Sequence, residues 1–440
     1  MNRDLCLLVF YAFMTATFEF PDVAFRIYCI KFLDYSPATF AMVTSTAVVP
    51  WSVKPVWGFI IDNSSRRKLA IVMCTIGFIL SWVLIAFRTG LTPIAMTTLL
   101  MCSSFFLCYM DVMADAELVK RVKLESPDVA GTLQSYVWGC RAVGSLLACL
   151  LGGYAAATQT NEFVFTATAL IIVPGSVALV YCTKDAPPCG CADVWRRVRM
   201  LKSTLRRREI FRPCIFVLIL ASMPSCYYAL VSFYQETLQF TPMQFAIVAA
   251  TEHLAHMQGA AMFKYKFRKI KFTTLFRWGI AILFFLRMLQ LVLIMRWNSK
   301  IHVSDMAFAI CESVAFSIVG QIMIMPICLV GARACPKGIE GSLYSTIMAI
   351  SNMGGLIAAY SGAALTKAYQ VENNDFTNMW KLSITCTAAS AIPAFFVHLM
   401  PNETPQSAGD GLELVNSTRQ TGQEAFSSQT QVEMQEEQKT

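Results

Sequence analysis

The sequence holds two carboxylates, Asp111 and Asp115, one helical turn apart at the end of a long apolar stretch. Ser104 and Cys108 precede them at offsets that place all four side chains on one face of a helix. A charged side chain inside a bilayer is tolerated when it faces a partner or a wet cavity. We therefore expect Asp111 to line a cavity and bind a solute there. We expect Asp115, nearer the helix end, to help close a gate.

Lys54 shares a helix face with Trp51 and Asp62 in the stretch PWSVKPVWGFIIDNSSRRK. At a rise of 1.5 Å per residue, Lys54 lies about 12 Å deeper than Asp62, too deep for its amine to reach the interface easily. It therefore needs an anion. This anion is either a carboxylate on another helix or the solute itself.

A polar face also runs along the stretch GTLQSYVWGCRAVGS, where Gln134, Trp138, Arg141 and Ser145 fall on one side of a helix. These residues suit a flat heterocycle that carries a carboxylate. The indole can stack on the ring, the amide can hydrogen-bond to its edge, and the guanidinium can form a bidentate pair with the carboxylate. An alternative stays open, in which Arg141 forms a structural bridge with an aspartate and Trp138 packs against lipid.

The candidate gate follows the second apolar stretch, where Asp62 is followed by Arg66, Arg67 and Lys68. This string resembles the signature loop of the major facilitator superfamily, in which the aspartate and arginines latch the closed cytosolic face. The alternative is that the cations only set the orientation of the chain in the membrane. Glu340 should lie at the same side, where it caps or latches a helix.

In the second part of the chain, Glu252 and His256 share a helix face, and a carboxylate beside an imidazole can carry a proton near neutral pH. The alternative is a buried, hydrogen-bonded pair. Glu312 is a lone acid in an apolar stretch and the expected partner of Arg287. Asn352 should offer its amide to the cavity. Two good ligands are too few for a metal site, so we expect no metal.

The composition defines the elements that must position these residues. Of 440 residues, 56% are hydrophobic and 15% are charged, whereas soluble domains have roughly a quarter charged residues. Stretches near the ~20 apolar residues that cross a bilayer recur about twelve times. They lie near residues 5–30, 38–61, 68–88, 93–116, 131–157, 163–182, 213–235, 242–263, 272–296, 303–331, 339–366 and 379–400. We expect an all-α membrane protein with about 12 transmembrane helices in two six-helix bundles.

Lys and Arg collect in the loops after the even-numbered stretches, which predicts that both termini are cytosolic. The net charge of +8 reflects this topology and does not indicate nucleic-acid binding. The predicted division is an N-terminal six-helix bundle, a basic cytosolic linker, a C-terminal six-helix bundle and a disordered cytosolic tail, at residues 1–182, 183–212, 213–400 and 401–440. We expect a monomer in the bilayer of the plasma membrane or an organelle.

Four motifs occur in order: PWSVKPVWGFIID, DVMADAELVKR, GTLQSYVWGCRAVG and CPKGIEGSLYSTIMAISNMGG. Over roughly residues 38–400 the chain resembles the folate-biopterin transporter family, a branch of the major facilitator superfamily. The resemblance implies uptake of folates, pterins or, in some members, S-adenosylmethionine. The motif positions are occupied by Lys54, Asp62, Asp111, Asp115, Gln134, Trp138, Arg141, Glu340 and Asn352.

The chain departs from the family pattern in two places. The first stretch contains Glu19, Asp22 and Arg26, of which Asp22 and Arg26 either pair with each other or line an outer vestibule. The eighth stretch contains Glu252 and the histidines at 253 and 256, which the family pattern does not include.

These patterns predict a secondary active transporter of folate- or pterin-type solutes that works by alternating access. Our hypothesis is that Asp111 and Arg141 pair in the empty cavity and that the anionic group of the solute competes for Arg141. Proton coupling is a further hypothesis. Two alternatives stay open: a carrier of S-adenosylmethionine or nucleoside-like solutes, and a membrane nutrient sensor that does not transport. We expect no enzyme activity and no cofactor, since no nucleophile, metal cluster or phosphate loop has a favourable context.

Overall fold

The computed structural model describes residues 3–88, 90–122, 132–185, 195, 199, 202, 203, 205–267, 269–333 and 340–402. Within these residues the secondary structure is helical, apart from connecting turns and one isolated bridge between Glu372 and Asp375. Most of the predicted basic linker and nearly all of the predicted tail lie outside the described residues, so their predicted structure stays untested.

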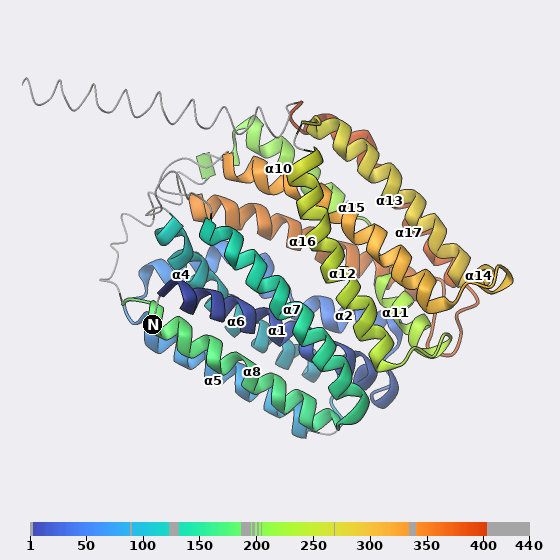
Figure 1. Cartoon of the computed structure of the whole chain (residues 1–440), viewed down its shortest axis with the longest axis horizontal. Helices are drawn as coiled ribbons and strands as arrows, with labels where there is room; N and C mark the ends of the chain where they lie inside the picture. The colour runs from blue at the N-terminus through green and yellow to red at the C-terminus, as the bar shows by residue number, and fades with distance from the viewer. Residues whose placement is uncertain are drawn as a thin grey trace, which may run out of the picture.

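The N-terminal bundle comprises the helices as far as Cys182. They are α1 (Arg3–Ile27) with its π-helical continuation η1 (Tyr28–Phe32), α2 (Pro37–Ala47), α3 (Val49–Ser52), α4 (Lys54–Asn63), α5 (Arg67–Phe87), α6 (Pro93–Val122), α7 (Thr132–Thr158) and α8 (Asn161–Cys182). In this bundle α1 packs against α7 and α8, while α5 packs against α6 and α8. In Figure 1 these helices are coloured blue to green and occupy the lower left.

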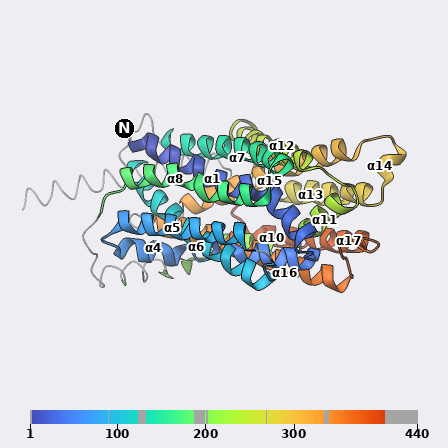
Figure 2. The same cartoon turned by 90° about the horizontal axis from the view of Figure 1, so that it is seen from below.

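The C-terminal bundle comprises the described helices from Arg208 onward. They are α10 (Arg208–Ala221), α11 (Tyr227–Glu236), α12 (Pro242–Met262) with η3 (Phe263–Phe267), α13 (Phe272–Ile294), α14 (Trp297–Lys300), α15 (Asp305–Arg333), α16 (Glu340–Ala368), α17 (Met379–Ser390) and η4 (Ile392–Leu399). Here α15 packs against both α12 and α13, and α10 packs against α16. The long helices of both bundles run roughly side by side along the length of the molecule (Figure 2).

Local sequence explains where several helices begin and break. The side-chain hydroxyls of Ser36 and Thr160 cap α2 and α8, and Thr241 forms a capping box with Gln244 at the start of α12. The predicted span over residues 38–61 is not one continuous helix, because it is divided into α2, α3 and α4. Both later segments have a proline in their first turn, where the missing N–H is tolerated.

The predicted span over residues 213–235 is also divided, into α10 and α11, and the break contains Pro224. Nine of the described helices are long and apolar enough to cross a membrane. The other three predicted spans correspond to α2–α4, α10–α11 and α12, the last of which contains Glu252, His253 and His256.

The two bundles meet along two seams. One joins α7 to α12, and the other joins α2, α3 and α4 to α16. Polar contacts add to these seams: Arg26 donates a hydrogen bond to the Tyr227 hydroxyl at 2.8 Å, and the Asn373 side-chain amide donates to the Tyr35 carbonyl at 3.0 Å. Residues of both bundles also line a cavity, which is described below with the candidate site.

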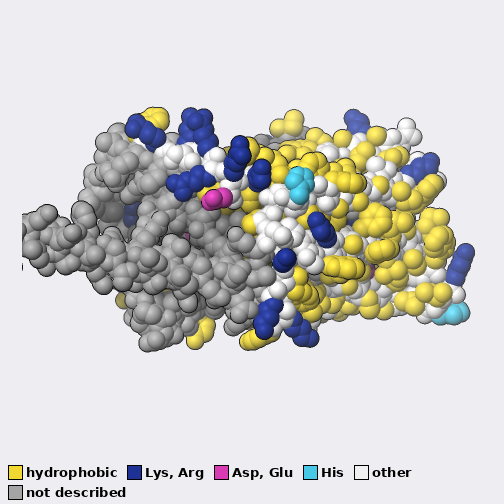
Figure 3. Space-filling view, turned by 90° about the horizontal axis from the view of Figure 1, so that it is seen from above, with side chains coloured by type: hydrophobic (Ala, Val, Ile, Leu, Met, Phe, Trp, Pro, Cys, Tyr) yellow, Lys and Arg dark blue, Asp and Glu magenta, His cyan; other side chains and the backbone are white. Residues whose placement is uncertain are grey.

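The outer surface of the described helices is largely apolar, as Figure 3 shows for one face. Trp278, Phe285 and Phe395 are among the large hydrophobic side chains that point outward. A soluble monomer rarely exposes such an extended apolar surface, whereas a bilayer requires one. The chain is therefore a multi-pass membrane protein.

Candidate functional site

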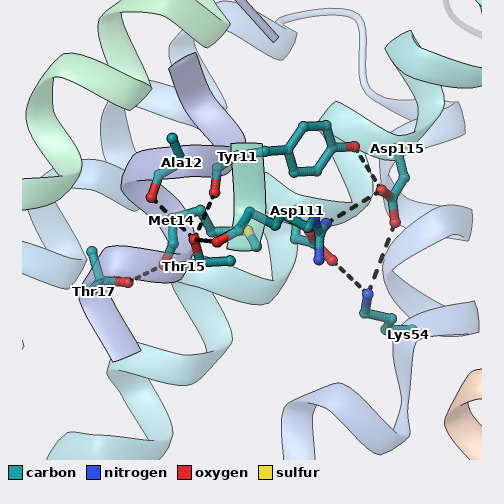
Figure 4. Close-up of polar contacts among 9 residues, drawn as sticks. Tyr11, Ala12, Met14, Thr15, Thr17, Lys54, Asp111 and Asp115 are labelled. Carbon is teal, nitrogen blue, oxygen red and sulfur yellow. Dashed lines mark hydrogen bonds and ion pairs between the residues drawn. The ribbon is translucent and has the colours of Figure 1, made fainter. Parts of the chain in front are cut away.

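One buried carboxylate joins two cations at the centre of the N-terminal bundle. The amine Nζ of Lys54 lies 2.5 Å from Oδ2 of Asp111, and Nη2 of Arg141 donates to Oδ1 of the same aspartate at 2.8 Å. Asp111 is 0% exposed. Each oxygen of Asp111 therefore has its own cationic partner, and these partners come from α4 and α7. Figure 4 shows Lys54 beside Asp111 and Asp115.

Asp115 lies one turn further along α6 and is more accessible. Its carboxylate oxygens are 3.9 Å from both Lys54 and Arg141, and its side chain is 45% exposed. The Tyr11 hydroxyl donates a hydrogen bond to Asp115 at 2.7 Å, and the Tyr11 ring lies under the Arg141 guanidinium at 4.4 Å. We call Lys54, Asp111, Asp115 and Arg141, together with Tyr11, the charge cluster. Its two cations and two anions balance.

The fold positions each member of the charge cluster separately. Lys54 is the first residue of α4, directly after the break at Val53, so the break carries its side chain toward α6. The backbone of Arg141 lies close to α1, because its carbonyl is one of three acceptors at 3.1 Å from the Thr15 hydroxyl. Gly144 allows this approach, because a side chain there would clash with the Ala12 carbonyl of α1.

A cavity of about 770 Å³ lies between the two bundles. Trp51, Arg141 and Ser145 line it from the N-terminal bundle, whereas Tyr227, Arg287 and Asn352 line it from the C-terminal bundle. Cavities of roughly 300–1,000 Å³ that are mostly apolar, with a few polar groups, are typical of small-molecule sites. Because Arg141 is one of the lining residues, the charge cluster contacts the cavity through it.

The other predicted binding residues differ in their placement. Asn352 lines the cavity and donates to the Trp51 carbonyl at 3.1 Å, which links α16 to α3. Trp138 is 54% exposed, and its ring lies 5.5 Å from the Arg141 guanidinium without lining the cavity. The side chain of Gln134 lies outside the described residues.

The predicted gate is only partly described. The side chains of Asp62 and Glu340 lie outside the described residues, and their role in the latch stays a prediction. Arg67 is buried at the start of α5, while Arg66 is exposed. Asp115 is the one predicted gate acid whose side chain is described, and it belongs to the charge cluster.

In the C-terminal bundle, the imidazole that meets a carboxylate is that of His253. Its Nε2 lies 3.1 Å from Oε2 of Glu19 on α1, which ties the two bundles together. The side chain of His256 is exposed. The sequence did not predict the contact between Glu19 and His253, because it joins residues more than two hundred positions apart.

Two predicted ion pairs have different outcomes. Asp22 and Arg26 do pair, at 2.7 Å. Glu312 and Arg287 do not form an ion pair within the described part of the chain. Glu312 accepts a hydrogen bond from the Gln290 amide at 3.4 Å and interacts with Arg287 electrostatically over a longer distance, so the predicted partnership does not take the form of a direct ion pair.

Tyr11 was not predicted from the sequence, because nothing near it in α1 marks it as different from other aromatic residues. We expect Tyr11→Phe to destabilise the protein by about 1 kcal/mol, since it removes the hydrogen bond to the Asp115 carboxylate and keeps the ring under Arg141. Thermal unfolding in detergent measures this loss. The matched control is Tyr181→Phe, at an exposed tyrosine, and an equal shift in both variants would contradict the prediction.

Comparison with known proteins places the chain among transporters. The model of the BT1 family matches residues 17–411. The folate-biopterin transporter of Synechocystis sp. is 26% identical over 386 residues, which cover 85% of this chain and 77% of that protein. Folate transporter 1 of Plasmodium falciparum is 24% identical over 377 residues, which cover 84% and 74% respectively.

Solved structures with a similar fold include a mutant of the nucleoside transporter NupG. Its TM-score is 0.71 at 13% identity, with 91% of this chain and 100% of that chain covered. A D-xylose-proton symporter has a TM-score of 0.66 at 12% identity, with 91% and 98% covered. At these identities the likeness shows the fold alone.

Proposed function

The chain belongs to the BT1 family, and from this premise we propose that it carries folate- or pterin-type solutes across the membrane by alternating access. Family and fold establish a membrane transporter with the helical architecture of the major facilitator superfamily. The solute class rests on relatives named as folate and folate-biopterin transporters, and on the chemistry of the cavity.

The observation that carries the proposal is that Arg141 of the charge cluster lines the cavity between the bundles. A guanidinium in this position can present two parallel N–H groups to a carboxylate or to the carbonyl edge of a heterocycle. Trp51, Tyr227 and Tyr228 line the same cavity and offer aromatic surfaces to a flat ring.

Two polar atoms at the cavity wall support a hydrogen-bonding solute. The indole nitrogen of Trp51 and the hydroxyl of Ser45 are buried and have no hydrogen-bond partner in the described part of the chain. A buried polar group without a partner is unfavourable by about 1–3 kcal/mol. Both atoms have almost no exposed surface, so a heterocycle would satisfy them only if the wall opened to admit it.

Movement requires a solute that binds the two states of the carrier differently, because equal affinity shifts no equilibrium. We propose that Asp111 and Arg141 pair in the empty carrier and that an anionic or carbonyl oxygen of the solute competes for Arg141. Asp111 keeps Lys54 as its partner during this exchange. The freed carboxylate is thus never left in the apolar interior without a cation.

The remaining site assignments are proposals of the same kind. Asp62, Arg66, Arg67, Asp115 and Glu340 would form the cytosolic gate, with both termini in the cytosol. Glu252, His256 and Glu312 would serve proton coupling, and uptake that does not respond to an imposed pH gradient would rule out that role.

The test is uptake of labelled folate, biopterin, S-adenosylmethionine and nucleosides by cells that express the chain. Saturable uptake of folate or biopterin above the background of untransformed cells supports the proposal. Uptake of S-adenosylmethionine or nucleosides alone would contradict the solute class. Binding without uptake would contradict transport and favour a sensor.

Arg141→Ala should lower uptake of the carried solute about tenfold or more, because it removes a charge-assisted contact worth about 1.5–3 kcal/mol. Uptake at low solute concentration, normalised to the amount of protein in the membrane, measures this change. Arg296→Ala is the control, since Arg296 forms a partly exposed pair with Asp305 away from the cavity. Equal uptake by Arg141→Ala and the wild type would refute the role of Arg141.

A further inference from the structure

A second guanidinium faces the cavity, and it belongs to the C-terminal bundle. Arg287 of α13 lines the same cavity as residues of α1, α3 and α7. Within the described part of the chain it forms neither an ion pair nor a hydrogen bond. Its guanidinium lies 5.4 Å from the centre of the Phe316 ring. Glu312, its expected partner, accepts a hydrogen bond from Gln290 instead.

Arg287 therefore differs from Arg141 in its charge balance. The charge of Arg141 is matched by Asp111 at 2.8 Å, and Asp115 and Lys54 complete a neutral group. Arg287 contacts the face of Phe316, which attracts a cation weakly compared with a carboxylate, and Glu312 attracts it only from beyond ion-pair distance. A guanidinium is always charged, and a charge among transmembrane helices is unfavourable until an anion or water compensates it.

We propose that Arg287 binds the carboxylate of the solute and thereby makes the carrier prefer carboxylated solutes, such as folates, over uncharged pterins. This inference rests on the proposed function, because it assigns a role to Arg287 in carrying those solutes. A solute anion that binds Arg141 must first displace Asp111. An anion that binds Arg287 displaces no carboxylate in direct contact with it in the described part of the chain, because Glu312 lies beyond ion-pair distance, so its net interaction is more favourable.

The placement of Arg287 also connects the two bundles through the solute. The unpartnered Ser45 hydroxyl and Trp51 indole line the cavity from the N-terminal bundle, whereas Arg287 lines it from the C-terminal bundle. A solute with a heterocycle at one end and a carboxylate at the other can contact both walls together. Such a solute holds the bundles closer than a pterin without a carboxylate would, and this difference favours the closed state.

The experiment compares uptake of labelled folate and biopterin by the wild type, Arg287→Gln, Arg287→Lys and Arg277→Gln, each normalised to protein in the membrane. Arg277 is the matched control, since it is an exposed arginine on the same helix and does not line the cavity. Arg287→Gln should lower folate uptake at subsaturating concentration about tenfold or more. Biopterin uptake should change by less than about twofold.

Arg287→Lys should recover part of the folate uptake, because lysine keeps the positive charge. The recovery should be incomplete, because lysine lacks the planar pair of N–H donors that a guanidinium offers to a carboxylate. Arg277→Gln should carry both solutes as the wild type does. Unchanged folate uptake in Arg287→Gln, or an equal fall for both solutes, would overturn the inference while leaving the proposed function intact. If only folate is carried, failure of Arg287→Lys to exceed Arg287→Gln would overturn it. A wild type that carries neither solute would overturn the proposed function and this inference with it.

Discussion

Asp111→Ala should abolish uptake and lower the free energy of unfolding by about 3–5 kcal/mol, the usual effect of removing one partner from a buried ion pair. Asp111 is fully buried, and its two oxygens hold Lys54 and Arg141. Without it, two cations face each other with only the more distant Asp115 to compensate them. Uptake and thermal unfolding in detergent, measured on the same preparation, test both effects.

The control for Asp111→Ala is Asp4→Ala. Asp4 also pairs with an arginine, Arg121, at 2.7 Å, but its side chain is 50% exposed. The Arg121 side chain is 15% exposed, so this pair is partly solvated, and the variant should lose less stability than Asp111→Ala and stay active. Lys54→Met combined with Asp111→Ala removes one charge of each sign, and it should recover stability without restoring uptake. Wild-type stability and uptake in Asp111→Ala alone would show that the charge cluster has no energetic role.

The sequence predicted the members of the charge cluster better than it predicted their contacts. Asp111, Asp115, Lys54 and Arg141 could be found because a charge in an apolar stretch is rare and helical periodicity gives its direction. Tyr11 could not be found, because a tyrosine is ordinary in such a stretch and its importance depends on a carboxylate 104 positions away.

The fold, too, could be predicted where local sequence determines it, but not where it depends on contacts between distant segments. Apolar stretches predicted the helical class and the approximate spans, since the bilayer sets their length. The helix break before Lys54 had a local signal in Pro50 and Pro55. Hydropathy averaged over about twenty residues does not detect a helix break of one or two residues. The contact of Glu19 with His253 had no local signal, because it depends on how the bundles dock.

Docking of the bundles depends on small residues where α7 meets α12. Gly153 lies against Ala246 and the Pro242 carbonyl, and a side chain at position 153 would overlap the Ala246 methyl group. Close approach of this kind needs glycine or alanine on one side of the seam. A carrier that alternates between two states must also let the bundles move along this seam.

Gly153→Leu should therefore abolish uptake, because its side chain forces α7 and α12 apart. Overpacking of this kind lowers the stability of the fold by about 1–3 kcal/mol. Gly139→Leu is the matched control on the same helix, since nothing lies within 4 Å of a side-chain carbon built there. The milder Gly153→Ala should lower uptake, and adding Ala246→Gly should restore it by moving the methyl group to the other helix. Full uptake in Gly153→Leu, or no recovery in the double variant, would show that the close approach of α7 and α12 does not limit transport.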